Sequence, residues 1–313
     1  MMPKVPRSAA TSEHGFVLVA VLWIVAALSA LATIFAVYLS NTAQALAIND
    51  TALQAEALVS ASLELTAYQL SLPGDGARPL QGTFHYRVDN ADIVASFVSE
   101  AARIDLNLAP KNFLANLLSG LGADPDDAAQ YADRIIGWRT PPKADAAEDE
   151  VSLYRAAGLA YSPRQAPFAH VNELALVLGL PPALVDRALP FVTVFSGLPK
   201  INALVAPPEV IAALPGMTPS GLKEFLRERP VLPRDMAAIA TALGPAQASA
   251  TIEKSDSFRI MTTVKFNNGR QASSEVVIGL GKEEDPYRVL SWQDQVGAAR
   301  SHPRKLADDT DDL

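Results

Sequence analysis

A stretch from Phe16 to Leu72 contains no glycine and no proline, although the chain of 313 residues holds 17 glycines and 23 prolines. These two residue types interrupt helices most strongly, because glycine is too flexible and proline lacks a backbone N–H. Their absence predicts one continuous helix of roughly 85 Å. Pro73 and Gly74 then end this helix.

The first part of this helix is uncharged from Phe16 to Leu39. An apolar helix of about 24 residues can cross the roughly 30 Å hydrocarbon core of a bilayer. Lys4 and Arg7 precede the segment, and the next charge after it is Asp50. Because basic residues stay on the cytoplasmic side, we expect the N-terminus in the cytoplasm and the bulk of the chain outside.

Beyond the membrane, apolar residues recur on this helix at helical spacing. Intervals of 3, 4, 3 and 4 residues separate Leu58, Ala61, Leu65, Tyr68 and Leu72. This spacing predicts a single apolar stripe on one side of the helix. The stripe is longer than one small sheet can cover. Its leucines, Leu58, Leu65 and Leu72, are therefore candidate residues of an assembly interface.

The remainder of the chain changes character twice. Residues 80–98 predict a hairpin with Asp89 and Asn90 at its turn, and residues 256–292 predict a second hairpin at Asn267-Asn268-Gly269 and a last strand. Residues 103–235 are predicted to be helical. The acidic tail, 296–313, is expected to be disordered. This order of long helix, strands, helical block and strands predicts an α+β fold.

An internal repeat lies in the helical block. The segment Ile104–Pro110 (IDLNLAP) is echoed by Ile201–Pro207 (INALVAP), and each leads into an apolar helix and a glycine turn. A related helix-turn unit begins between them at Glu173. The repeat supports a helical block that interrupts the strands as a separate insertion.

The chain as a whole resembles a known family. A basic leader, the junction Gly15-Phe16 and the long helix resemble type IV prepilins and pseudopilins, although a plain signal anchor would also fit this segment. With the helical repeats and the ending Tyr287–Trp292 (YRVLSW), the order resembles protein K of type II secretion systems, a minor pseudopilin family. The resemblance covers most of the chain and rests on the ordered combination of these features.

This resemblance implies a pilin-like α+β fold. It would have a long transmembrane helix and a small antiparallel sheet, interrupted by an inserted all-α domain of helix-hairpin-helix or SAM-like units. The expected segments are the leader 1–15, the helix 16–72, strands 73–102, helical units 103–198 and 199–250, strands 251–295 and the tail 296–313.

The resemblance also implies how the chain is processed. Prepilin peptidase would cut between Gly15 and Phe16 and methylate the new N-terminus. Most pilins carry a glutamate five residues into the mature chain, where this chain has Ala20. A subunit without that carboxylate has no partner for the amine of a chain ahead of it, which suits a filament tip.

The expected setting is the bacterial inner membrane, crossed once, with most of the chain in the periplasm. The resemblance implies minor pseudopilins I and J, the major pseudopilin, prepilin peptidase and the inner-membrane platform as partners. The chain would prime pseudopilus assembly for protein export across the outer membrane.

Metal binding is a further implication of the resemblance. Pseudopilins of this system often bind calcium, and the acidic cluster Asp145, Glu148, Asp149 and Glu150 is the candidate site. Calcium takes six to eight oxygen ligands, several of them carboxylates. The alternative is a solvated acidic loop, because the spacing matches no standard calcium loop.

The sequence contains no recognisable catalytic motif. There is no cysteine, Walker loop, Gly-x-Ser-x-Gly motif or dinucleotide fingerprint, and the four histidines are scattered. We therefore expect no enzyme. His170 precedes a helix that we expect Asn172 or a neighbour to cap, and Asp124 with Pro125 marks another helix start.

Nucleic-acid binding is the alternative function. Helix-hairpin-helix units often bind DNA, so the chain could be a membrane-tethered DNA-binding protein of a competence or type IV pilus system. Residues 103–235 hold 13 Lys plus Arg against 15 Asp plus Glu, and the whole chain carries a net charge of −8. Because phosphate binders normally show a basic surface, we expect no nucleic-acid partner.

Overall fold

The computed structural model describes residues 13–72, 78–141, 150–281 and 285–295. It divides into two compact units, Met1–Ala57 and Leu58–Leu313. The predicted helix is confirmed as α1 (Glu13–Ser71), which begins three residues earlier and ends one residue earlier than expected. In the first unit, Val17–Thr42 is long and apolar enough to cross a membrane, with a mean hydropathy of 2.6.

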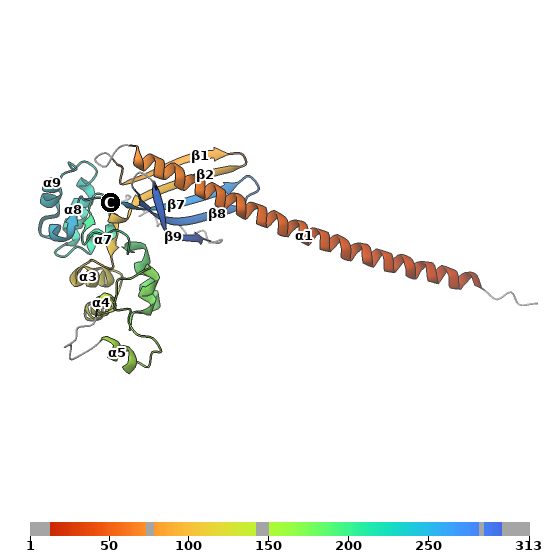
Figure 1. The fold of residues 1–313 in the computed structure, drawn as a ribbon, viewed down its shortest axis with the longest axis horizontal. Coiled ribbons are helices and arrows are strands. Elements are labelled where there is room, and N and C mark those ends of the chain that lie inside the picture. The colour runs from red at the N-terminus through yellow and green to blue at the C-terminus, as the bar shows by residue number, and fades with distance from the viewer. Residues whose placement is uncertain (1–12, 73–77, 142–149, 282–284, 296–313) are drawn as a thin grey trace, which may run out of the picture. The chain divides into compact units, whose positions relative to one another are not determined.

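The second unit contains a five-stranded antiparallel sheet in the order β1-β2-β7-β8-β9 (Figure 1). Two strands precede the helical elements in the sequence and three follow them, yet β2 and β7 are neighbours in the sheet. The predicted combination of helix and antiparallel sheet is therefore confirmed. The strands are β1 (Gln81–Val88), β2 (Ala91–Ser99), β7 (Ser257–Phe266), β8 (Gln271–Leu280) and β9 (Tyr287–Gln295).

Both hairpins predicted from the sequence are confirmed. Asp89 and Asn90 connect β1 to β2, and Asp89 has a φ of 49°. Gly269 has a φ of 82° in the turn between β7 and β8. Tight hairpin turns need such left-handed backbone, which glycine, asparagine and aspartate adopt most easily.

One core of the second unit lies between α1 and the sheet. Hydroxyl and carboxylate groups of α1 bond to tyrosines of β1 and β9, so the helix lies across this sheet (Figure 1). Burying one leucine or isoleucine side chain there stabilises the fold by about 1.5–3 kcal/mol. The buried apolar side chains include Val59, Leu63, Ala67 and Leu70 of α1 and Ile93, Phe97, Ile260 and Val264 of the strands.

The chain between β2 and β7, residues 100–256, is called the helical region below. It shares a hydrophobic core of its own, in which Trp138 stacks on Phe168 with ring centroids 6.0 Å apart. Its elements are η1 (Glu100–Ala102), β3 (Ile104–Asp105), α3 (Lys111–Gly120), α4 (Pro125–Arg139), α5 (Glu150–Ala156), η2 (Val171–Leu176), α6 (Pro182–Ala188), η3 (Leu189–Phe191), β4 (Val192–Thr193), β5 (Ile201–Asn202), α7 (Pro208–Ala212), α8 (Pro219–Glu228), α9 (Met236–Leu243), η4 (Gly244–Ser249) and β6 (Ala250–Thr251).

The sequence repeat in this region is also a structural repeat. In the first repeat, residues 104–193, β3 pairs in parallel with β4; in the second, residues 201–251, β5 pairs in parallel with β6. Asp105 and Asn202 occupy the same place. The Oδ1 atom of each accepts the backbone N–H two residues later, at 2.8 Å and 3.1 Å. Each side chain therefore shapes the turn that follows its strand.

An arginine closes each turn from the far end of the second helix. Arg139 donates to the carbonyls of Leu106 and Ala109, with 2.7 Å to the latter. Arg229 donates to the carbonyl of Ala206 at 2.6 Å. Both arginines bond to carbonyls of the turn, so the two repeats use the same long-range contact.

The helix that carries each arginine begins in the same way. Asp124 caps α4 by accepting the Asp126 N–H at 3.1 Å, and Thr218 caps α8 by accepting the Gly221 N–H at 3.1 Å. A proline follows each cap. The predicted helix start at Asp124 is confirmed.

Candidate assembly surface

The predicted stripe on α1 faces solvent within the second unit. Leu65, Tyr68 and Leu72 are 36%, 61% and 64% exposed. Ala61 is also exposed, and Leu58 is half-buried. A line of apolar side chains on one side of a helix is an exposed apolar surface of the kind that partner proteins cover. Whether these residues contact a partner stays a prediction.

A different face of α1 packs on the sheet, and the apolar spacing in the sequence does not reveal it. Ser62 and Thr66 lie among the buried apolar residues of this face and interrupt the apolar pattern. Thr66 donates to the Ser62 carbonyl at 2.7 Å, and Ser62 donates to the Leu58 carbonyl at 2.9 Å. These bonds to the preceding turn satisfy both hydroxyls, so they can be buried at little cost.

Polar contacts fix the rotation of α1 on the sheet. The Ser62 hydroxyl lies 2.7 Å from the Tyr86 hydroxyl of β1, and the Tyr287 hydroxyl of β9 donates to Glu64 at 2.9 Å. Burial, together with the hydrogen bond and charge of Glu64, raises the pKa of Tyr287 to about 12. The phenol therefore stays a donor, and the contacts on both sides leave the stripe facing outward.

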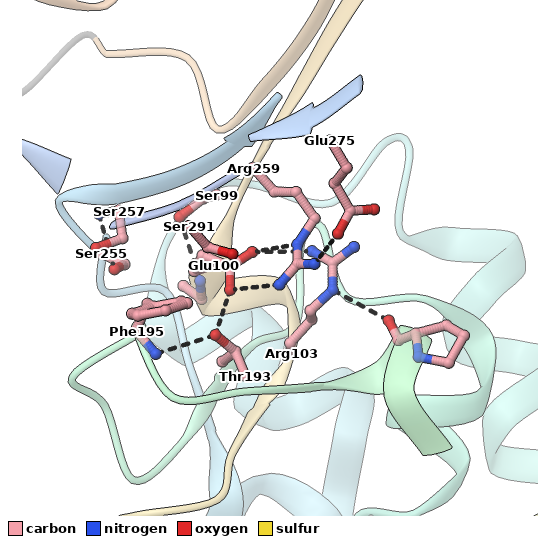
Figure 2. Close-up of polar contacts among 12 residues, drawn as sticks. Ser99, Glu100, Arg103, Thr193, Phe195, Ser255, Ser257, Arg259, Glu275 and Ser291 are labelled. Carbon is pink, nitrogen blue, oxygen red and sulfur yellow. Dashed lines mark hydrogen bonds and ion pairs between the residues drawn. The ribbon is translucent and has the colours of Figure 1, made fainter. Parts of the chain in front are cut away.

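A buried ion cluster connects the sheet to the first repeat, as Figure 2 shows. Glu100 is fully buried and accepts two hydrogen bonds from Arg259 of β7, at 2.8 Å and 3.1 Å. It also accepts from Thr193 of β4 and, at 3.3 Å, from Arg103. One carboxylate therefore joins β7 to the beginning and the end of the first repeat.

The remaining contacts balance the charge of this cluster. Arg259 also pairs with Glu275 of β8, and Arg103 donates to the Pro190 carbonyl at 3.0 Å (Figure 2). Burial by itself would raise the pKa of Glu100, but Arg259, with Arg103, holds that pKa below its ordinary value. Glu100 therefore stays ionised, and each buried charge has an opposite partner, as a stable buried cluster requires.

The predicted processing site lies at the start of α1. Gly15 and Phe16 have helical backbone, and their side chains lie outside the described residues. Cleavage and methylation there stay predictions.

Most of the predicted calcium cluster falls outside the described residues, namely Asp145, Glu148 and Asp149. Glu150 is described, and its carboxylate lies 3.0 Å from the Arg134 guanidinium. No group of three or more His, Asp or Glu side chains in the described ranges could hold a metal ion. Because three of its four residues lie outside the described ranges, the calcium site stays a prediction.

His170 is a helix cap. Its Nδ1 atom accepts the Asn172 N–H at 3.2 Å and so begins η2. The cap predicted here is therefore a neighbour of Asn172. The Nε2 atom faces β9, 3.4 Å from the Ser291 hydroxyl, so His170 also connects the helical region to the sheet.

Three comparisons with known proteins agree on one family. Residues 95–197 match the family model described as type II secretion system (T2SS), protein K. Over 192 residues the chain is 28% identical to the type II secretion system protein K of Klebsiella pneumoniae, which covers 55% of this chain and 57% of that relative. The chain thus spans little more than half the length of this curated relative.

The fold is similar to a solved structure, the crystal structure of the GspK-GspI-GspJ complex from the type 2 secretion system of enterotoxigenic Escherichia coli. The TM-score is 0.63 at 16% identity, over 80% of this chain and 98% of that chain. The resemblance to protein K that the sequence predicts is confirmed by these findings.

Proposed function

We propose that this chain is protein K of a type II secretion system, a minor pseudopilin that assembles with companions I and J. The observation that carries the proposal is the double-faced helix α1. One apolar face packs on the chain's own sheet, and the other, from half-buried Leu58 to Leu72, faces solvent. A complex of GspK with GspI and GspJ is known for the structural relative, which supports these companions as the proteins that cover the stripe.

The same proposal includes placement in the inner membrane. Lys4 and Arg7 precede the apolar segment, so the N-terminus faces the cytoplasm and the sheet and helical region face the periplasm. Prepilin peptidase cuts after Gly15 and methylates Phe16. Mass spectrometry of the chain expressed with its peptidase should show this methylated N-terminus, whereas an intact Met1 would contradict a pseudopilin.

Tip placement is the finer part of the proposal. Ala20 stands where a carboxylate would neutralise the amine of another subunit. The helical region adds about half of the chain between two neighbouring strands, a bulk that a thin filament could not repeat. Both features favour a subunit at the end of the pseudopilus, where it primes assembly for export across the outer membrane. Electron microscopy that found this chain along the whole filament would contradict tip placement.

The helical region belongs to this proposal as an inserted domain of helix-hairpin-helix or SAM-like units. The parallel strand pair, the capped helices and the closing arginine occur twice in it. We assign it a structural role and no catalytic one. DNA binding that weakened steeply with salt would favour the alternative, a membrane-tethered DNA-binding protein.

The test of the companions uses the full-length chain in detergent with full-length minor pseudopilins I and J. The native chain should form a discrete complex of low order. Leu65→Asp should weaken its Kd at least about tenfold, because an unpaired charge in an apolar interface costs more than about 1.4 kcal/mol.

The matched control is Ser60→Asp, which adds the same charge to an exposed position of the same helix outside the stripe. It should leave the Kd unchanged. Equal binding by both variants would contradict a role for the stripe, and no complex with the native chain would contradict the companions.

A further inference from the structure

The outer edge of β1 presents unpaired backbone groups. Ser99 donates its backbone N–H to the Leu80 carbonyl at 2.7 Å, which sets which residues of the hairpin are hydrogen-bonded pairs. Because antiparallel pairs alternate, every second residue of β1 bonds to β2 and the others point their N–H and C=O away from it. The outward residues are Gln81, Thr83, His85 and Arg87.

This edge has only one of the usual protections, the charged side chain of Arg87 near the end of the strand. All four outward residues are exposed, and among the described residues none has a backbone hydrogen bond on this side of the strand. The strand keeps an unbroken register over eight residues, without proline, lysine or bulge. The other edge differs, because β9 follows Pro286, its ladder contains a bulge near Val277, and His170 packs against it. Natural proteins protect free edges in these ways, so an edge of this length with so little protection is unusual.

The free edge adjoins the exposed stripe of α1. The Tyr86 hydroxyl of β1 lies 2.7 Å from the Ser62 hydroxyl and 3.3 Å from the Leu58 carbonyl. Ser62 belongs to the buried face, but it lies four residues from Leu58 and three from Leu65, so it marks the border between that face and the stripe. Glu64, which bonds β9, lies on the opposite side. β1, which carries the free edge, therefore lies at the border of the stripe.

We propose that a companion pseudopilin adds an extended strand to the outer edge of β1 while its first helix packs on the stripe. This inference rests on the proposed function, which places that helix beside Leu65. A protein held there has its next segments beside β1, where main-chain bonds give affinity without demanding a particular sequence. The four outward residues supply the N–H and C=O groups for these bonds.

Hydrogen exchange tests the strand directly in the full-length chain, in detergent, with and without full-length companions I and J. The outward amides of Thr83 and His85 should exchange rapidly in the free chain and at least about 100-fold more slowly in the complex. The inward amides of Phe84 and Tyr86 bond to β2 and serve as the internal control, because they should be protected in both states.

Two variants test the same edge by affinity. His85→Pro removes an outward N–H and leaves the bonds from β1 to β2 in place. Thr83→Lys adds a charge beside the same edge. Because it introduces no proline, it still tests the edge if His85→Pro fails to fold. Each should weaken the Kd for the companions at least about tenfold. Gln271→Lys adds the same charge to an exposed position of β8, and it should bind as the native chain does.

The outcomes separate this inference from the proposed function. A complex of native affinity in which the outward amides stay unprotected would overturn strand addition and leave the companions in place. Absence of any complex with the native chain would overturn both. Protection that appears without companions and rises with the concentration of this chain would identify a second copy as the occupant, and it would overturn the companion.

Discussion

The two repeats of the helical region share a backbone and differ in the polar group that holds it. In the first, the Oδ2 atom of Asp105 accepts from the Gly197 N–H and the Ser196 hydroxyl, both at 3.0 Å. In the second, the Nδ2 atom of Asn202 donates to the Glu253 carbonyl at 2.9 Å. The acid faces donors, and the amide faces an acceptor.

This difference shows which part of the side chain each repeat constrains. In both repeats the Oδ1 atom accepts the backbone N–H two residues later and so shapes the turn. The second polar atom of the side chain is an oxygen or a nitrogen according to whether the segment after β4 or β6 offers hydrogen-bond donors or an acceptor. The first repeat is also joined to the sheet through buried charges, at Glu100, whereas no buried ion pair of this kind is found for the second repeat among the described residues. The predictions below test this contrast by free energies of unfolding, measured by urea titration of the full-length chain in detergent.

Removing Glu100 should have the largest effect. Glu100→Ala leaves Arg103 and Arg259 without their buried partner, so the free energy of unfolding should fall by about 3–5 kcal/mol. The control Glu253→Ala removes an exposed carboxylate beside the second repeat and should change it by less than about 0.5 kcal/mol. Similar values for the two variants would show that the ion cluster does not distinguish the repeats.

Exchanging acid and amide should come second. Asn202→Asp places a carboxylate oxygen against the Glu253 carbonyl at a fully buried position, which should cost about 2–3 kcal/mol at pH 7. Asp105→Asn turns an amide N–H₂ toward the Gly197 N–H and should cost about 1–2 kcal/mol. If either exchange left the free energy of unfolding unchanged, the hydrogen-bond partner would not determine whether an acid or an amide occupies the position.

The closing arginines should give a smaller and graded effect. Arg139→Met removes donors from two carbonyls and should cost about 2 kcal/mol, whereas Arg229→Met removes a donor from one and should cost about 1 kcal/mol. Methionine keeps most of the apolar stem, so the comparison isolates the hydrogen bonds. A larger loss of stability for Arg229→Met than for Arg139→Met would show that the number of hydrogen bonds to the turn does not determine the effect.

The smallest effect should be a pH dependence found only in the first repeat. Burial raises the pKa of Asp105 above its ordinary 3.8, although bonds from Asn107, Ser196 and Gly197 oppose this. A raised pKa in the folded state means stability that is present below pH 3.8 and lost as the pH rises through the raised value. The native chain should therefore lose stability relative to Asp105→Asn over that range. Asn202→Ala should show no such difference from the native chain.

Local patterns predicted much of this fold. The helix α1, both hairpins and the cap at Asp124 depend on residues within a few positions of one another, and the sequence displays them. The repeat was visible because Ile104–Pro110 and Ile201–Pro207 carry the turn-forming residues. Such features follow from helix and turn chemistry that acts over short distances.

The contacts that join distant segments could not be predicted in this way. Glu100 and Arg259 lie 159 positions apart, and nothing in either neighbourhood marks them as partners. The inner face of α1 was missed because hydroxyl groups at Ser62 and Thr66 hide it. The exposed stripe was recognised from its spacing, but any partner that covers it lies outside the chain, so binding experiments must test this prediction.

The adjacency of β2 and β7 makes the helical region separable from the sheet. Ser99 lies opposite Phe258, so the chain leaves the sheet and re-enters it at neighbouring points. Antiparallel neighbours need only a two-residue turn to connect them. The helical region therefore leaves and re-enters the sheet without interrupting any strand pairing of the sheet. Excising residues 100–256 and closing the gap with Asn-Gly should therefore leave a miniature protein that keeps α1 and the five-stranded sheet.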